Sequence, residues 1–276
     1  MSTAPLALPP LDHSYPLTQE QVDAYARDGF VRLRGVCSPD EIRAYRQVIV
    51  EAAMRYNVEQ RPMEERDTYG KAFLQIMNLW EVDEAARQFV FARRFAEIAA
   101  RLMQVDAIRL YHDQALFKEP GGGHTPWHQD QFYWPLATDK TITMWMPLID
   151  LSAEMGTMRF APGSQQEGYL GPIPISDESE RMFNEFLSSK GYSVTENVDM
   201  AAGDATFHSG WCLHGAPGNR TQTTREAMTI IYFEDGAKIL EPDHPNRQAD
   251  LDRWLPGGVP GEPAASTLNP VLWRRS

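Results

Sequence analysis

Five short runs rich in β-branched and aromatic residues lie between positions 107 and 233 and limit the folds open to this chain. Glycine and proline clusters separate the runs, which read AIRLYHDQALFKEP, TITMWMPLID, GTMRFAP, DATFHSG and AMTIIYF. Such residues favour strands, and short strands with turn signals between them are typical of a sandwich or barrel. The sequence therefore predicts a double-sheet jelly roll, cupin-like, over about residues 105–234.

Helical signals dominate the residues before this region. Capping sequences predict a short helix from about residue 19 and a longer one over about 39–57, and helical spacing returns at 82–104. The polar stretch 61–71 is interpreted as a surface loop or lid, and 176–191 as a helix inserted between strands. Helices first and strands second predict an α+β fold, with a jelly-roll core flanked by N-terminal helices.

One domain is expected, because neither an internal repeat nor a sharp shift in composition divides the chain. We expect a flexible arm over 1–17 and a single domain over 18–276. Within that domain, helical support is predicted over about 18–104, and an irregular proline- and glycine-rich tail over about 235–276.

Composition narrows the function classes. Hydrophobic residues make up 42% and charged residues 23%, which is ordinary for a globular protein. The net charge of −12 disfavours binding to nucleic acid or to an anionic membrane, so a small-molecule substrate is expected. Cys37 and Cys212 form no C-x-x-C pair, and the N-terminus carries no signal-peptide pattern, so a cytoplasmic location is expected. No apolar run is long enough for a transmembrane helix, and the oligomeric state is not readable from the sequence.

A histidine and an aspartate stand two residues apart in 124-HTPWHQDQFYW-134. If this stretch is an extended strand, His128 and Asp130 point to the same face while Gln129 faces away. Packing of a histidine beside an aspartate is the plainer interpretation of such a pair. A second polar cluster, 208-HSGWCLHGAPGNRTQTTREAMTIIYF-233, nevertheless offers a third metal ligand and a cation.

Two histidines and one carboxylate on one face of an octahedral ion leave the remaining positions open, as in non-haem Fe(II) oxygenases. A structural zinc ion would instead have four protein ligands, and a hydrolytic zinc ion would have one open position beside a general base. The pattern favours iron over structural zinc and leaves hydrolytic zinc open.

The chain resembles the phytanoyl-CoA dioxygenase (PhyH-like) family of Fe(II)- and 2-oxoglutarate-dependent oxygenases. That family has a W-H-x-D motif with an aromatic-rich sequel, a proline-glycine-serine turn, and an L-H-x-(S/A)-x-x-N motif with a later arginine. The matching segments are 127-WHQDQFYW-134, 161-APGSQ-165 and 213-LHGAPGNRTQTTR-225. The resemblance implies His128, Asp130 and His214 as the catalytic iron ligands. His208 is the rival for the last position, but the turn context and the spacing to the later arginine favour His214.

The resemblance also implies the cosubstrate site, with Arg225 binding the distal carboxylate of 2-oxoglutarate. A guanidinium forms a bidentate, charge-assisted pair with a carboxylate. Arg225 opens an apolar strand, whereas Arg220 lies in a turn and is expected to face solvent. Gln114 is expected to make an accessory contact with 2-oxoglutarate, and Trp145 to point into the same site.

Two positions depart from the family pattern. Ala216 stands where many relatives have a serine that hydrogen-bonds the cosubstrate, which leaves the carboxylate dependent on Arg225 and on Thr223 or Thr224. Gln165 replaces the histidine usual after the proline-glycine-serine turn. Asp130 argues against halogenation, since related halogenases have a small residue there.

Together these observations predict an enzyme that uses Fe(II), 2-oxoglutarate and O2 to hydroxylate, or otherwise oxidise, a C–H bond of a small organic molecule, releasing succinate. A free small molecule in secondary metabolism is favoured over a coenzyme A ester, because only Arg220 and Arg225 lie near the motifs. Six aromatic residues are candidates for the pocket wall: Trp80, Trp127, Phe132, Tyr133, Trp134 and Trp211. The alternatives are a cupin-like metal-dependent hydrolase or isomerase, and a non-enzymatic jelly-roll binding protein.

Overall fold

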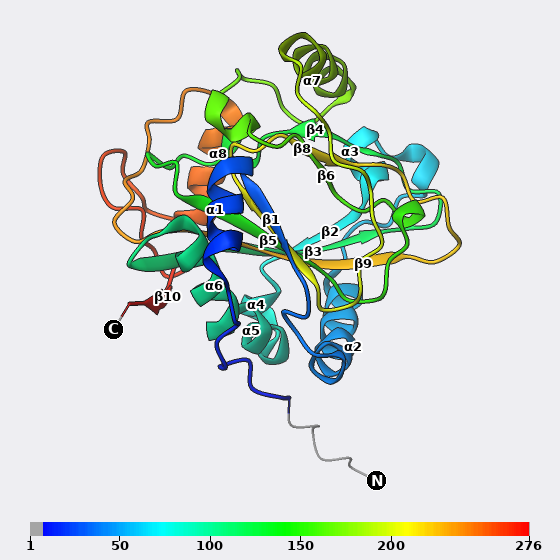
Figure 1. Ribbon diagram of the computed structural model, residues 1–276, viewed down its shortest axis with the longest axis horizontal. Coiled ribbons are helices and arrows are strands. Elements are labelled where there is room, and N and C mark those ends of the chain that lie inside the picture. The colour runs from blue at the N-terminus through cyan, green and yellow to red at the C-terminus, as the bar shows by residue number, and fades with distance from the viewer. Residues whose placement is uncertain (1–7, 276) are drawn as a thin grey trace.

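Two antiparallel sheets form the centre of the computed structural model, which describes residues 8–275 (Figure 1). The larger sheet has the strand order β1-β7-β5-β9-β3-β10, with β2 also paired to β3, and the smaller has the order β4-β8-β6. The large-sheet strands are β1 (Phe30–Leu33), β2 (Leu74–Met77), β3 (Ala107–Lys118), β5 (Thr141–Pro147), β7 (Ala205–Ser209), β9 (Arg225–Glu234) and β10 (Val271–Arg274). The small-sheet strands are β4 (Thr125–His128), β6 (Arg159–Phe160) and β8 (His214–Ala216). The predicted α+β jelly roll is confirmed.

N-terminal helices cover the outer face of the larger sheet, on the side away from β4, β8 and β6 (Figure 1). They are α2 (Pro39–Tyr56), α4 (Leu79–Val82), α5 (Glu84–Val90) and α6 (Arg93–Met103), and α1 (Gln19–Asp28) leads into β1. The capping boxes at Thr18 and Ser38 are both formed, as the sequence predicts. The predicted helical stretch 82–104 is interrupted between α5 and α6.

Strand β5 shows how the sheet separates a packed core from a cavity. Ile142, Met144 and Met146 belong to the main hydrophobic core under the helices. Thr143 and Trp145 point the other way and line a cavity between the two sheets. Successive side chains of a strand alternate between its faces, so one strand supplies both environments.

The structure differs from the sequence expectation in three segments. Loop 61–71 contains a 3-10 turn (Met63–Glu65) and most of a short helix, α3 (Thr68–Ala72). The tail after residue 234 is not irregular throughout, because it forms α8 (Pro245–Trp254) and then β10.

The third difference concerns the arm. Residues 1–7 of the expected flexible arm lie outside the described part of the chain, and some side chains of residues 8–17 pack on the core. Leu11 and Leu17 are buried, and Arg94 donates a hydrogen bond to the carbonyl of His13. Apolar side chains at these positions explain the packing, since burying them removes their surface from water.

The inserted helix is confirmed as α7 (Asp177–Lys190), which begins after a Ser176 cap and ends at the left-handed Gly191. Three further 3-10 turns span Asp130–Phe132, Ala153–Met155 and Ser164–Glu167. Every helix within residues 8–275 is too short or too polar to cross a lipid bilayer.

Candidate active site

Adjacent strands of the small sheet bring two histidines together. His128 is the last residue of β4, His214 is the first of β8, and the two are paired across the ladder. Asp130 lies beyond the strand end, at the start of a 3-10 turn, rather than on an extended strand as expected. Gln129 between them remains extended and hydrogen-bonds the carbonyls of Gly168 and Trp211. Asp130 therefore still reaches the same side as His128.

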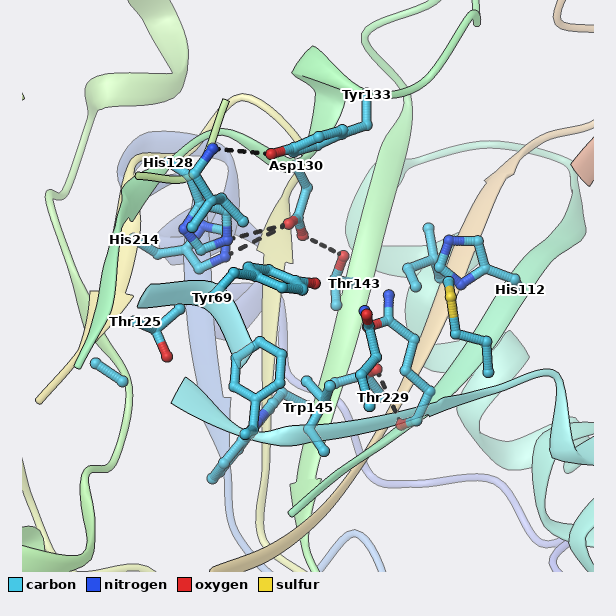
Figure 2. A pocket seen from close by; sticks show the side chains of 18 of the residues that line it. Tyr69, His112, Thr125, His128, Asp130, Tyr133, Thr143, Trp145, His214 and Thr229 are labelled. Carbon is cyan, nitrogen blue, oxygen red and sulfur yellow. Dashed lines mark hydrogen bonds and ion pairs between the residues drawn. The ribbon is translucent and has the colours of Figure 1, made fainter. Parts of the chain in front are cut away.

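The three side chains converge on one point (Figure 2). Their candidate ligand atoms all lie within 4.8 Å of one another. Oδ1 of Asp130 is 3.4 Å from Nε2 of His128 and 3.6 Å from Nε2 of His214. Nδ1 of His128 lies 2.7 Å from the carbonyl of Pro126, and Nδ1 of His214 lies 2.9 Å from the carbonyl of Cys212. A proton held on Nδ1 leaves the Nε2 lone pair free for a metal ion.

The other oxygen of Asp130 is held from the larger sheet. Oδ2 accepts a hydrogen bond from Thr143 at 2.8 Å and lies 3.3 Å from Nε2 of His208. His208 and Thr143 are themselves paired across β7 and β5. Nδ1 of His208 contacts no carbonyl within residues 8–275, unlike the other two histidines. His208 thus contacts the oxygen of Asp130 that the other two histidines do not approach.

Protonation states in the cluster suit metal binding. Burial, with the neighbouring His128 and His208, lowers the pKa of His214 well below its ordinary value, so this ring is neutral. Burial by itself would raise the pKa of Asp130, but the surrounding histidines outweigh it and hold that pKa well below the usual range. A neutral imidazole and an ionised carboxylate are the forms that bind a divalent cation.

This donor set fits Fe(II). Two imidazole nitrogens and one carboxylate oxygen on one side of an ion match the facial arrangement of non-haem iron sites. The set lacks a thiolate, since both cysteines are buried elsewhere with pKa values raised by burial to about 12. A closed structural zinc site would require a fourth ligand, and none joins the cluster among the described residues.

Arg225 enters the same cavity from the first position of β9. It is 2% exposed, and its Nη1 donates to the carbonyl of Gly156 at 2.6 Å. Its Nε has no partner within the described chain, and neither has Nε1 of Trp145, over whose ring the guanidinium lies at 5.3 Å. Burial lowers the pKa of Arg225 to about 9, which leaves it charged at neutral pH. Unpaired donors beside a buried cation form a site for a carboxylate.

Residues that are paired across β3, β9 and β5 of the larger sheet extend this site. Gln114 pairs with Thr229, which pairs with Trp145, and all three line the cavity. Oε1 of Gln114 accepts a hydrogen bond from Gln75 at 2.7 Å. Gln114 and Trp145 thus share the cavity with Arg225, whereas Arg220 is exposed.

A threonine hydroxyl lies opposite Ala216, at a position that the sequence did not indicate. Thr223 and Thr224 do not line the cavity; Thr125 does, and it pairs with Ala216 across β4 and β8. Sequence reasoning missed this pairing because Thr125 and Ala216 are far apart in the chain. The signal that could have suggested it is a hydroxyl residue, Thr125, close to the first motif in the sequence.

Sequence reasoning also left Lys118 without a role. Lys118 is fully buried and pairs with Arg225 across β3 and β9. Its Nζ donates to the carbonyl of Gly123 and lies 3.4 Å from Oγ1 of Thr125, and no carboxylate of residues 8–275 pairs with it. Burial, with the charge of Arg225 as the second cause, lowers the pKa of Lys118 to about 6. Arg225, which is charged at neutral pH, and Lys118, which is neutral above about pH 6, therefore lie side by side across β3 and β9.

The cavity measures about 500 Å³, within the range of small-molecule sites. Of the six aromatic candidates only Tyr133 and Trp134 line it. Trp127, for example, is tied to α7 through Asn184, and Trp211 to Asp139. Strands of both sheets and their loops supply most of the remaining wall. Two elements that the sequence interpretation did not recognise as helices also contribute, α3 through Tyr69 and α8 through Ala249, Asp250, Arg253 and Trp254.

The family model of phytanoyl-CoA dioxygenase (PhyH) matches residues 25–227. Among curated proteins, the methylphosphonate hydroxylase of Gimesia maris is 26% identical over 224 residues, covering 78% of this chain and 80% of that protein. The ectoine dioxygenase of Streptomyces anulatus is 22% identical over 249 residues, covering 82% of each.

Solved structures show the same fold. The 2-oxoglutarate-dependent carbocyclase SnoK from nogalamycin biosynthesis superposes with a TM-score of 0.76 at 24% identity, covering 93% of this chain and 96% of that one. The epimerase SnoN, solved in complex with Fe3+, 2-oxoglutarate (alpha ketoglutarate) and a nogalamycin compound, has a TM-score of 0.74 at 24% identity, covering 92% and 98%. At these identities the likeness establishes the fold.

Proposed function

The chain belongs to the phytanoyl-CoA dioxygenase family, and from this we propose that His128, Asp130 and His214 bind the Fe(II) of its 2-oxoglutarate-dependent oxygenase reaction. Arg225 binds the distal carboxylate of 2-oxoglutarate, with Trp145 and Gln114 as further contacts. The reaction oxidises a small organic molecule and converts 2-oxoglutarate and O2 to succinate and CO2.

One observation carries this proposal: a convergent His-Asp-His cluster and a buried arginine with an unpaired donor line the same cavity. A hydrolytic zinc site would explain the cluster but would leave Arg225 and the unpaired Nε1 of Trp145 without a ligand. A dicarboxylate cosubstrate accounts for both groups, because buried donors are normally satisfied.

When bound, Fe(II) with 2-oxoglutarate and O2 supplies an oxidant strong enough to break a C–H bond. The protein's own residues bind the metal ion and 2-oxoglutarate, orient them and shield them from water. Thr143 and His208 hold Asp130 as a carboxylate turned toward the histidines. Arg225 fixes one end of the cosubstrate from a rigid strand, and the walls around it exclude water, which strengthens each charged contact.

The test uses wild-type protein loaded with Fe(II) under nitrogen and then given 2-oxoglutarate and air. Succinate is expected even without substrate, at the slow rate of uncoupled turnover. Calorimetric titration of the metal-loaded protein with 2-oxoglutarate provides a second measurement that does not depend on turnover. Absence of both binding and succinate would overturn the proposal and favour the hydrolase or isomerase alternative.

Lys118 supplies a prediction about stability and pH. The unfolded chain keeps a proton on this amine up to about pH 10, whereas the folded protein releases it above about pH 6. The unfolded state therefore binds more protons between these values, so the free energy of unfolding rises with pH across that window. Lys118→Met is expected to flatten this rise, by up to about 1.4 kcal/mol per pH unit, and to stabilise the cosubstrate-free protein at pH 7.

The same substitution should weaken 2-oxoglutarate binding roughly tenfold, because a dianion bound at Arg225 would restore the positive charge of its neighbour Lys118. Urea unfolding between about pH 6.5 and pH 8.5 and calorimetry measure the two effects, with Lys140→Met as the exposed control. A less stable Lys118→Met protein at pH 7 would contradict the prediction, since it would mean that the amine is charged and paired.

For the substrate, we propose a free small molecule rather than a coenzyme A ester. The two basic side chains beside the cosubstrate site, Arg225 and Lys118, are buried, so neither is exposed to bind the phosphates of coenzyme A. Relatives named for methylphosphonate and ectoine are consistent with this choice. A role in secondary metabolism and a cytoplasmic location belong to the same proposal.

A further inference from the structure

The cavity continues past the candidate iron ligands to α8, where polar groups stand that the proposed chemistry does not use. Asp250 on α8 and His112 on β3 line this end. Figure 2 shows His112 on the opposite side of the cavity from His128 and His214. Arg225 and Trp145 occupy a different part of the wall, so the α8 end is open to the substrate rather than to 2-oxoglutarate.

Asp250 has one satisfied and one unsatisfied oxygen. Oδ2 accepts a hydrogen bond from the hydroxyl of Tyr111 at 2.9 Å. Oδ1 has no hydrogen-bond partner among residues 8–275, and no lysine or arginine in that range forms an ion pair with the carboxylate. Arg253, on the next turn of α8, is exposed, and its guanidinium stacks on Trp254 at 4.4 Å. The carboxylate thus lines the cavity without an ion pair, although the rise in its pKa caused by burial is opposed by the charge of the exposed Arg253.

Tyr69 and Tyr133 line the same cavity as Asp130 and Asp250. Burial raises the pKa of Tyr133 to about 12, and the charges of both Asp130 and Asp250 add to that rise. Tyr69 has its pKa raised by burial, with smaller contributions from the same two carboxylates. Because all four side chains line one cavity, a molecule that reaches from Asp250 toward Asp130 has these two rings in its wall.

His112 provides a second polar atom at the same end. Its side chain is 3% exposed, and its Nδ1 has no partner within the described chain. The ring lies between Tyr111 and Trp254, with centroid distances of 5.0 and 4.8 Å. Burial lowers its pKa to about 3, so the ring is neutral and one nitrogen can accept a hydrogen bond. An unpaired buried group of this kind is costly unless a ligand completes it.

Charge balance indicates what the α8 end should bind. With the cosubstrate in place, the cations Fe(II), Arg225 and recharged Lys118 lie with Asp130 and the dianion of 2-oxoglutarate, and Lys118 is at the end of β3, six residues from His112. Asp67 and Arg253 also line the cavity, but both are exposed at its mouth. Asp250 remains as a half-buried carboxylate without an ion-pair partner among residues 8–275. Burial raises its pKa to about 7, so a cation beside it would favour full ionisation.

We propose that the α8 end of the cavity binds a protonated amino group of an otherwise apolar, ring-containing substrate, with Asp250 as its counter-charge and His112 as a further hydrogen-bond acceptor. Tyr69, Trp134 and Trp254 contact the body of such a molecule, and aromatic faces also attract cations. This inference rests on the proposed function, because the charge balance counts bound Fe(II) and 2-oxoglutarate.

The test compares three probes that share an indole ring: tryptamine, tryptophol and indolepropionate, which end in an ammonium, a hydroxyl and a carboxylate. Each is titrated by calorimetry into protein loaded with Fe(II) and 2-oxoglutarate under nitrogen. Wild-type protein is expected to bind tryptamine at least about tenfold more tightly than tryptophol, with indolepropionate weakest. Asp250→Asn should remove the preference for tryptamine, and Asp252→Asn, an exposed position on the same helix, should keep it.

Binding of 2-oxoglutarate to Asp250→Asn, measured first, shows whether the variant is folded and separates the two hypotheses. If wild-type protein fails to bind 2-oxoglutarate, the proposed function fails. If both proteins bind it but the order of the probes is unchanged by Asp250→Asn, only the present inference fails. A uniform loss for all three probes would mean that Asp250 merely ties α8 to Tyr111. No binding of tryptamine to the wild type would also overturn the inference.

Discussion

Arg225→Ala is expected to abolish 2-oxoglutarate binding and, with it, succinate formation by the Fe(II)-loaded protein. The guanidinium is 2% exposed, and its only hydrogen-bond partner within residues 8–275 is the carbonyl of Gly156. Truncating one member of a buried charge pair costs about 2–5 kcal/mol, or roughly thirtyfold to several thousandfold in Kd. Calorimetry on the metal-loaded protein and a succinate assay measure the two losses.

Two control variants separate the loss of the carboxylate contact from general damage. Arg220→Ala removes an exposed arginine five positions earlier and should bind 2-oxoglutarate normally. Arg225→Lys keeps the positive charge but cannot make a bidentate contact, so its affinity for 2-oxoglutarate should lie between those of the wild type and Arg225→Ala. Arg225→Ala should still bind Fe(II), because the arginine does not contact the histidines. Unchanged 2-oxoglutarate affinity in Arg225→Ala would assign the distal carboxylate to another group, with Lys118 the nearest.

The site was predictable from the sequence where its chemistry lies in contiguous motifs. His128, Asp130 and His214 fall in two short segments whose order and spacing follow a family pattern, and the structure brings the three side chains together. Asp130 lies in a 3-10 turn and not in an extended strand, but its side chain still meets those of His128 and His214. Gln129 stays extended, so the chain still turns Asp130 toward His128 even though the strand ends one residue earlier.

Contributions that depend on pairing between distant strands were not predictable in the same way. Lys118 and Arg225 are neighbours because β3 and β9 are paired in one register, and Thr125 lies opposite Ala216 because β4 is paired with β8. A shift of one residue in either register would turn those side chains to the opposite face. No local pattern in the sequence specifies that register.

The wall of the cavity at α8 was missed for another reason. The tail was interpreted as irregular from its prolines and glycines, although Pro245 at the first helical position is a helix-start signal. The side chain of His244 caps this helix by accepting from the backbone of Arg247, a role usually taken by serine, threonine, aspartate or asparagine. The absence of a common cap residue concealed the helix that carries Asp250.

His128→Ala is expected to reduce Fe(II) binding by more than about a hundredfold and to leave no measurable succinate formation. Groups that only support a metal ligand typically cost 10–100-fold when mutated, so the loss of a ligand should exceed that range. The metal content after anaerobic loading and calorimetric titration with Fe(II) measure the first effect. His124→Ala, a histidine in the preceding loop that does not line the cavity, should bind Fe(II) normally.

His208→Ala is the decisive comparison, because three histidines surround Asp130. His128 and His214 approach Oδ1, at 3.4 and 3.6 Å, whereas His208 approaches Oδ2 at 3.3 Å. A supporting role predicts a loss of roughly 10–100-fold for His208→Ala, smaller than the loss for His128→Ala. The opposite order, with Fe(II) retained in His128→Ala and lost in His208→Ala, would exchange the two histidines in the ligand set. Asp130 would then bind iron through the oxygen that faces His208, and Thr143 would lose its partner.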